Sequence, residues 1–152
     1  MPNIDITYIK TRVGEDELAR LTDHSGGAIS NTQITACITD ATAVVDTVLF
    51  QKYGEPLVFA SGDSGDRAKE YIRRIKFDIA LYYLYNKKHD DEEMKDVYVR
   101  YNKAFSQLEK IRKGDINIIG LTSNNTQSSI IEVSTVEDDR IFTKERMGWI
   151  IS

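Results

Sequence analysis

The sequence predicts a mainly α-helical protein: a small bundle of about four main helices, followed by a short β-hairpin and an extended C-terminal arm. In the first part, apolar residues recur every three or four positions, which is typical of helices that bury one face. After Gly114, Ser, Thr and Asn become frequent and β-branched runs replace the helical period. We therefore expect a helical bundle domain over residues 1–113 and a hairpin with an assembly arm over residues 114–152.

Two short helices are expected at the N-terminus. Thr7 is a candidate cap for a helix over Tyr8–Val13, and Gly14 suits the position that ends it. Three acids, Glu15-Asp16-Glu17, then favour the start of a second helix that runs to Thr22, because negative charge is stabilised at a helix N-terminus.

The first long helix is expected to follow Ser30, which forms a capping box with Gln33. Its apolar stripe includes Ile34, Ala41 and Leu49. It should end near Tyr53-Gly54, because Pro56 cannot continue a helix. A linker is then expected over Leu57–Asp66.

Two further long helices complete the expected bundle. The one from about Asp66 to Lys87 becomes apolar on nearly all sides from Phe77 onward, so it should lie at the centre. The last one covers about Glu92–Lys113, and its basic C-terminal turn precedes Gly114.

The C-terminal part predicts two strands and an arm that contacts another molecule. The strands are expected at Ile116–Leu121 and Ser129–Val136, and a lone hairpin is marginal in water without a partner surface. The segment beyond them is too short to bury its own large side chains, and aromatic and Met residues often carry interface energy. The expected contact residues are Ile130, Val133, Arg140, Phe142, Met147 and Trp149.

The charge is unevenly distributed along the chain. The net charge is −4, but residues 1–60 carry −4, residues 61–113 carry +3 and residues 114–152 carry −3. The acidic arm and the basic middle could attract each other within or between subunits, and a solvated mixture of charges is the alternative. No concentrated basic face indicates nucleic-acid binding.

No catalytic, cofactor or metal site is expected. The two histidines, His24 and His89, are far apart, and the loop at Asp23 lacks the Gly and Glu that a calcium loop needs. Cys37 is alone and is expected to be a buried apolar residue, which fits a reducing compartment. Asp78 lies in the most apolar stretch, so it should form a structural ion pair with Arg100 or Lys103.

Two other features have alternatives. The cluster of Tyr82, Tyr83, Tyr85, Tyr98 and Tyr101 could stack on bases, but tyrosines at helical spacing are more often core residues. No apolar run approaches the ~20 residues that span a bilayer, and the N-terminus does not resemble a signal peptide, so no membrane partner is expected.

Several segments, in the same order along the chain, resemble a phage Mu-like family of small head-region proteins. Gly14–Leu18 with Leu21-Thr22-Asp23 resembles the opening of that family, and Asp78–Tyr85 resembles its central helix. Arg100-Tyr101, with Ala104, Leu108 and Gly114, resembles the next helix and its end. Arg140–Met147 resembles the terminal segment.

The resemblance implies a virion structural protein of the head–tail connector, or adaptor, type. Such a protein is made in the host cytoplasm and forms a ring of about twelve copies in the neck of the virion. It docks beneath the portal protein, contacts tail or stopper proteins and surrounds the genomic DNA without reading its sequence. The alternatives are a tail-terminator or other neck protein, or a small nucleic-acid-binding regulator that uses Arg67–Lys76 as its recognition helix. An enzyme is not expected.

Overall fold

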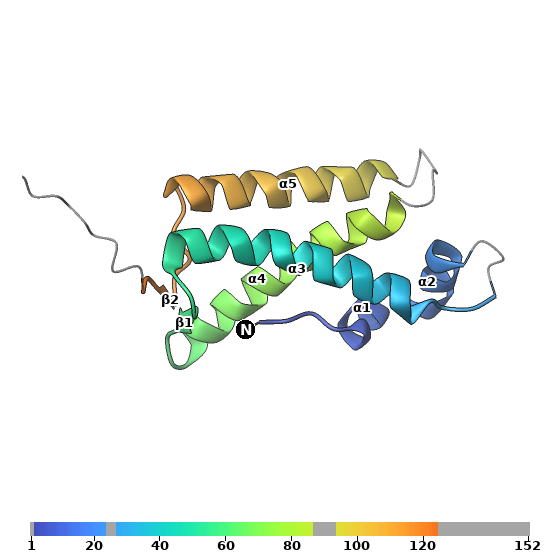
Figure 1. The fold of residues 1–152 in the computed structure, drawn as a ribbon, viewed down its shortest axis with the longest axis horizontal. Coiled ribbons are helices and arrows are strands. Elements are labelled where there is room, and N and C mark those ends of the chain that lie inside the picture. The colour runs from blue at the N-terminus through green and yellow to red at the C-terminus, as the bar shows by residue number, and fades with distance from the viewer. Residues whose placement is uncertain (1, 24–26, 87–93, 125–152) are drawn as a thin grey trace, which may run out of the picture.

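The computed structural model describes residues 2–23, 27–86 and 94–124, and it confirms a mainly helical bundle with a small antiparallel sheet (Figure 1). Two short helices come first, three long helices form the body, and two very short strands close one end. The elements are α1 (Ile6–Val13), α2 (Glu15–Thr22), α3 (Asn31–Tyr53), β1 (Val58–Phe59), α4 (Asp63–Tyr85), α5 (Met94–Lys113) and β2 (Leu121–Thr122).

Helix α4 is the centre of the bundle, as its sequence predicts. It packs against both α3 and α5, which also contact each other. In Figure 1, α4 crosses behind α3 and reaches α5, while α1 and α2 lie at the far end from the strands. From Ile75 to Leu81 every side chain of α4 is buried, because neighbours cover the helix on all sides.

The N-terminal helices begin and end largely where expected, with one correction. Asp5, not Thr7, caps α1: its Oδ1 accepts a hydrogen bond from the Tyr8 amide at 2.7 Å. The helix therefore begins at Ile6, two residues earlier than predicted. Gly14 ends α1 with φ of 93° and is at once the first flanking residue of α2.

The long helices also follow their capping residues. Ser30 Oγ accepts from the Gln33 amide at 3.4 Å at the start of α3, and α3 ends at Tyr53 before Gly54. Helix α4 begins at Asp63, three residues earlier than predicted, and ends at Tyr85. Asp63 and Asp66 both lie in its first turn, where a carboxylate is favoured by the helix dipole.

The sheet differs from the predicted hairpin. Strand β1 pairs antiparallel with β2, with Val58 opposite Thr122 and Phe59 opposite Leu121. The strand predicted over residues 116–121 is therefore wrong except at its end, and its partner comes from the expected linker. The physical reason is burial: Ile118 and Leu121 pack into the core, which draws this segment onto the bundle. The second predicted strand, 129–136, lies outside the described residues.

The segment after α5 is fixed to the end of α3. The Tyr53 hydroxyl accepts a hydrogen bond from the Ile118 amide at 2.8 Å in a buried position. The Asn124 amide donates to the Tyr53 carbonyl at 2.6 Å, and Asn124 Nδ2 donates to the Pro56 carbonyl at 3.1 Å. The expected domain boundary at residue 113 thus coincides with the end of α5, but residues 116–124 still pack on the bundle.

Helix α3 is long and apolar enough to cross a membrane by length and composition alone. One face of it, with Ile34, Ala41, Val45 and Leu49, is buried in the bundle. The opposite face is exposed and carries mainly Thr and Ala. One-sided burial of this kind is typical of a helix that forms part of a protein core.

Candidate interaction site

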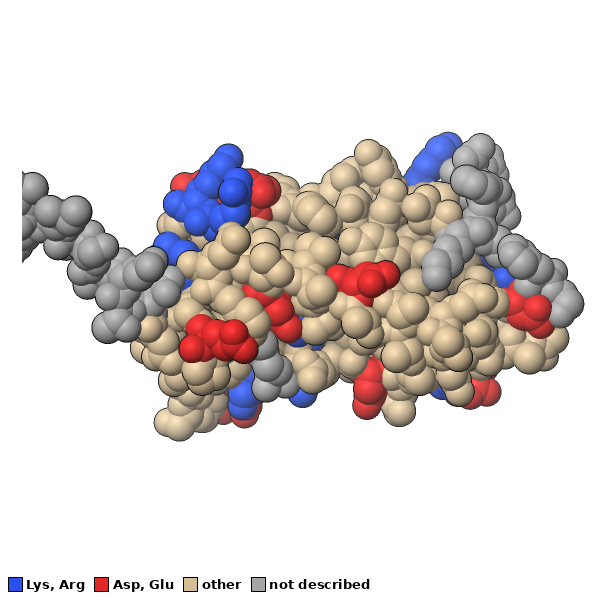
Figure 2. All heavy atoms as spheres, viewed as in Figure 1, with Lys and Arg blue, Asp and Glu red and all other residues tan. Residues whose placement is uncertain are grey.

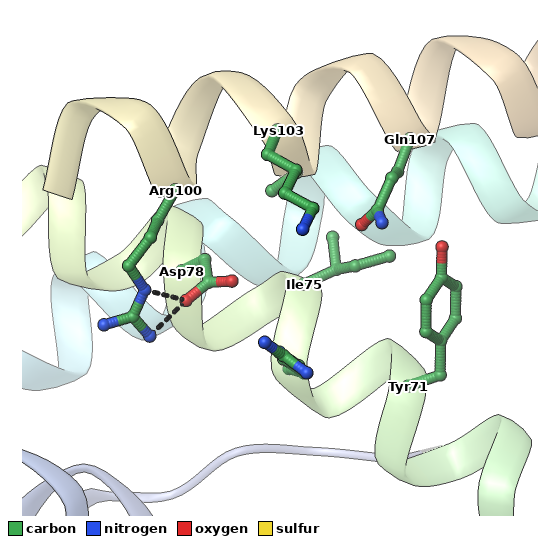
Figure 3. A pocket seen from close by; sticks show the side chains of 8 residues that line it. Tyr71, Ile75, Asp78, Arg100, Lys103 and Gln107 are labelled. Carbon is green, nitrogen blue, oxygen red and sulfur yellow. Dashed lines mark hydrogen bonds and ion pairs between the residues drawn. The ribbon is translucent and has the colours of Figure 1, made fainter. Parts of the chain in front are cut away.

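The six expected contact residues, Ile130, Val133, Arg140, Phe142, Met147 and Trp149, lie outside the described residues. The described part of the chain instead shows surfaces that could receive a partner. The best defined is a cleft between α4 and α5 (Figure 3).

An ion pair between Asp78 of α4 and Arg100 of α5 forms one end of this cleft. Arg100 Nε and Nη2 donate to Asp78 Oδ1 at 3.0 and 2.5 Å. The carboxylate is mostly buried and the guanidinium is about half exposed, with side-chain exposures of 12% and 48%. The guanidinium also lies 5.5 Å from the centre of the Phe77 ring. Arg100 is therefore held in place while one side of its charge still faces solvent.

The cleft has a volume of about 250 Å³ and an excess of positive charge. Its polar lining comes from Tyr71, Arg74, Asp78, Arg100, Lys103 and Gln107. In Figure 3, Lys103 and Gln107 extend from α5 and Tyr71 extends from α4 towards them. Within the described part of the chain, Asp78 is paired with Arg100, whereas Arg74 and Lys103 form no ion pair. Three cations and one carboxylate leave a net charge of +2 at this site.

Tyr71 adds a neutral polar group to the same cleft. Burial raises the pKa of the Tyr71 hydroxyl above its ordinary value, and the nearby Tyr53 adds to the shift. The hydroxyl therefore stays protonated at neutral pH and can donate a hydrogen bond. Cations with a hydroxyl donor form a site suited to a carboxylate or another oxyanion.

A second hollow adjoins the first and shares Arg100 with it. Its volume is about 360 Å³, and its apolar floor is formed by Phe77, Leu81 and Val97. Arg12 lies across from Arg100, with its guanidinium 5.7 Å from the Phe77 ring, and pairs with Glu70 at 3.0 Å. The two arginines therefore flank a buried aromatic ring.

A fully buried lysine is the main feature that the sequence did not reveal. Lys76 of α4 is 0% exposed, and its Nζ lies 2.8 Å from Asp46 Oδ1 of α3, whose side chain is 14% exposed. The contact has ion-pair distance but not hydrogen-bond angles. A signal was present, because Lys76 stands between Ile75 and Phe77, directly before the stretch of α4 that is apolar on nearly all sides.

The helix proposed for nucleic-acid recognition, residues 67–76, does not present a continuous basic face. Ile72, Ile75 and Lys76 are buried against the bundle. Arg73 lies 3.6 Å from Glu70 on the same helix, which offsets its charge. The exposed basic residues of this helix, Arg67 and Arg74, are thus separated by the exposed acid Glu70.

The tyrosine cluster is largely a packing feature. The rings of Tyr82 and Tyr101 stack with centroids 3.9 Å apart, and Tyr101 also contacts Phe105 at 4.8 Å. The Tyr85 hydroxyl donates to Glu17 at 2.8 Å and links α4 to α2. Tyr98 is 51% exposed, so it is the member of the cluster most available to a partner.

The Asp23 loop uses its carboxylate to hold the backbone. Asp23 Oδ2 accepts hydrogen bonds from the amides of Gly27 and Ala28, each at 3.1 Å. Within the described residues, no three His, Cys, Asp or Glu side chains are grouped so that they could hold a metal ion.

The exposed face of α3 carries little charge, and Asp40 is its one exposed charged residue (Figure 2). In Figure 2, much of this side of the molecule is uncharged, whereas Lys and Arg gather at the C-terminal end of α5. The residues on the outer stripe of α3 are Thr32, Thr35, Ala36, Thr39, Asp40, Ala43 and Thr47. Three of the threonine hydroxyls donate to carbonyls one turn earlier in the same helix, at 2.7 to 2.9 Å. These donors are thus already satisfied, which lowers the cost of removing the face from water.

Comparison with known proteins gives one family. The family described as "Bacteriophage Mu, Gp36" matches residues 5–136 of this chain. The match includes the segments at Gly14, Asp78 and Arg100 that carry the resemblance, and it stops before Arg140–Met147. No curated protein and no solved structure matches.

Proposed function

Because the chain belongs to the Bacteriophage Mu, Gp36 family, we propose that it is a structural subunit of a tailed-phage head–tail connector ring. In this proposal the ring docks beneath the portal protein and extends the DNA channel towards the tail. The C-terminal arm of each subunit contacts a neighbouring subunit or the portal. The subunit acts by binding, without a chemical step.

The observation that carries this proposal is the low charge of the outer face of α3. An exposed helix of 23 residues in a protein with 29% charged residues would ordinarily carry charges on its solvent side. From Thr32 to Thr47 the outer stripe of α3 carries a single charged residue, Asp40. Depletion of charge is the compositional mark of the centre of a protein–protein interface. A subunit of a closed ring needs such a face on a rigid body.

The arm supplies the second element of the proposal. It contains Phe142, Met147 and the single Trp149, which are suited to fill pockets on a neighbour. Residues 116–124 are anchored to the bundle at Tyr53, so the arm starts from a defined point on each subunit. A fixed starting point lowers the entropy that is lost when the arm binds.

The native mass of the full chain across a concentration series tests the proposal. We expect a discrete ring-sized species, with rings visible by electron microscopy. Truncation after Asp139 should leave a folded bundle, by circular dichroism, that no longer assembles. Rings formed as readily by the truncated chain would contradict the role of the arm.

A substitution on α3 separates the two elements. Ala43→Arg places a bulky cation on the charge-poor face of α3 and should weaken assembly, because a charge buried in an interface is costly. Asn102→Arg, at an exposed position of α5, is the matched control and should assemble normally. Equal assembly by both variants would exclude the α3 face as an interface.

A further inference from the structure

We infer that the cleft between α4 and α5 binds the acidic segment Glu137-Asp138-Asp139 of the C-terminal arm of a neighbouring copy. This inference rests on the proposed function in one respect only, namely that the acidic segment comes from a neighbouring subunit. The recognition itself depends on the chemistry of the cleft and on the sequence of the arm.

The first step is the unused positive charge of the cleft. Arg100 is largely committed to Asp78, whereas Arg74 and Lys103 have no ion-pair partner within the described residues. Both side chains are exposed and both line the same cleft of about 250 Å³. Two free cations from two different helices can contact one short acidic segment together, and Tyr71 can add a hydrogen bond.

The second step is the identity of the acidic segment. Residues 125–152 carry five acids, and three of them are consecutive at 137–139. This segment begins 13 residues after Asn124, which corresponds to a reach of about 43 Å when extended. Helix α5, with 20 residues, is about 30 Å long. The segment can therefore reach a cleft midway along a bundle, on its own subunit or on an adjacent one.

The other acidic runs are less suitable. Glu15-Asp16-Glu17 belongs to α2, where Glu17 binds Arg20 and Tyr85. Asp90–Glu93 lies in the seven-residue connection between Asn86 and Met94, which is tied at both ends. Lys103 is nine residues into α5, about 14 Å along the axis from Met94. An acid at the middle of that connection, four residues from either end, would need almost its full main-chain extension of about 13 Å along α5 to come level with Lys103.

Crosslinking of the full-length protein tests the inference directly. Unlabelled and ¹⁵N-labelled chains are mixed, allowed to assemble and treated with a carbodiimide, which joins a lysine to a carboxylate that contacts it. We expect Lys103 to be joined to Glu137, Asp138 or Asp139, with mixed-isotope peptide pairs showing that the donor is a neighbour. Lys110, which is exposed on α5 outside the cleft, is the internal control and should not join these acids.

Charge variants in the full chain provide the matched controls. Arg74→Glu should lower the Lys103 crosslink several-fold, whereas Arg67→Glu, at an exposed position of the same helix, should not. Reversal of both sides, with Arg74→Glu and Lys103→Glu in the cleft and lysine at all three positions 137–139, should restore crosslinking between the same positions. Circular dichroism checks that each variant is folded.

The outcomes separate this inference from the proposed function. Rings that form without a crosslink from Lys103 to 137–139 would overturn the inference and leave the connector proposal standing. Crosslinks from Lys103 to residues 90–93 would also overturn it, as would crosslinks to 137–139 that occur only within one chain. Loss of DNA binding in the Arg74→Glu/Lys103→Glu variant, without any arm crosslink in the wild type, would assign the cleft to nucleic acid instead.

Discussion

Loss of one partner of the buried ion pair between Lys76 and Asp46 should destabilise the bundle strongly. The perturbation is Asp46→Asn, which keeps the shape of the side chain and removes its charge. It leaves the ammonium of Lys76, which is 0% exposed, with no opposite charge beside it. The change therefore isolates the electrostatic part of the contact between α3 and α4.

The magnitude follows from the distance and the burial. At 2.8 Å, two unit charges attract each other by about 6 kcal/mol at an effective dielectric constant of ~20. Removing both charges from water costs several kcal/mol for each, so the net contribution of the intact pair is small. Removal of one partner leaves the desolvation of the other uncompensated. Asp46→Asn should therefore lower the free energy of unfolding by about 3–5 kcal/mol.

Urea denaturation followed by circular dichroism measures this loss. The double variant Asp46→Leu/Lys76→Met should lose much less than Asp46→Asn, because no unpaired charge remains. Glu109→Gln breaks the exposed pair of Glu109 and Arg112 and is the control, with an expected loss of at most about 1 kcal/mol. A loss below about 1 kcal/mol for Asp46→Asn would refute the reasoning, since the Lys76 ammonium would then be solvated.

Two further predictions concern the backbone and pH. Gly120→Ala should lower the free energy of unfolding by about 1–3 kcal/mol or more, because φ is +91° and the added Cβ would lie 2.2 Å from the Ser64 carbonyl oxygen. Gly62→Ala is the control in the same urea titration. It should cost less, because Gly62 has φ +77° but open space around it. Burial raises the pKa of four tyrosines above 10.0, so the unfolded chain loses these protons first. The contribution of these tyrosines to stability should therefore be constant below about pH 10 and fall above it. Tyr71→Phe should make that alkaline fall less steep, and an unchanged slope would contradict the assignment. The four tyrosines are Tyr8, Tyr71, Tyr83 and Tyr101.

Sequence reasoning located the helices well because their ends are set by local chemistry. Ser30 and Gly54 act through hydrogen bonds and dihedral angles within a few residues, and the structure confirms both. The strands were harder to predict, because β1 and β2 have only two residues each and pair across more than sixty positions of sequence. No local pattern identifies a pairing of that kind, which depends on Ile118 and Leu121 reaching the core.

The interaction site was predicted only in part for a related reason. An ion-pair partner for Asp78 could be predicted, because an unpaired carboxylate in an apolar helix is costly. Arg100 was a candidate because it lies on the next helix along the chain. The partner of Lys76 could not be found in the same way, since Asp46 lies on a different helix at an unremarkable polar position. The cleft depends on how α4 and α5 face each other. Helical periodicity predicts the buried side of each helix, but it does not predict the crossing angle that places Arg74 and Lys103 on either side of one cleft.

The root of the arm offers a test of how firmly residues 116–124 belong to the bundle. Tyr53→Phe removes the hydroxyl that accepts a hydrogen bond from the buried Ile118 amide at 2.8 Å. The amide that is left without a partner should lower the free energy of unfolding by about 1–3 kcal/mol. Loss of stability alone would not show where the change acts, so hydrogen exchange of the Ile118 amide is the decisive measurement. We expect that amide to exchange faster, while amides in the centre of α4 change only as the global stability does. Unchanged protection at Ile118 would show that burial in the core, and not the Tyr53 hydroxyl, fixes the start of the arm.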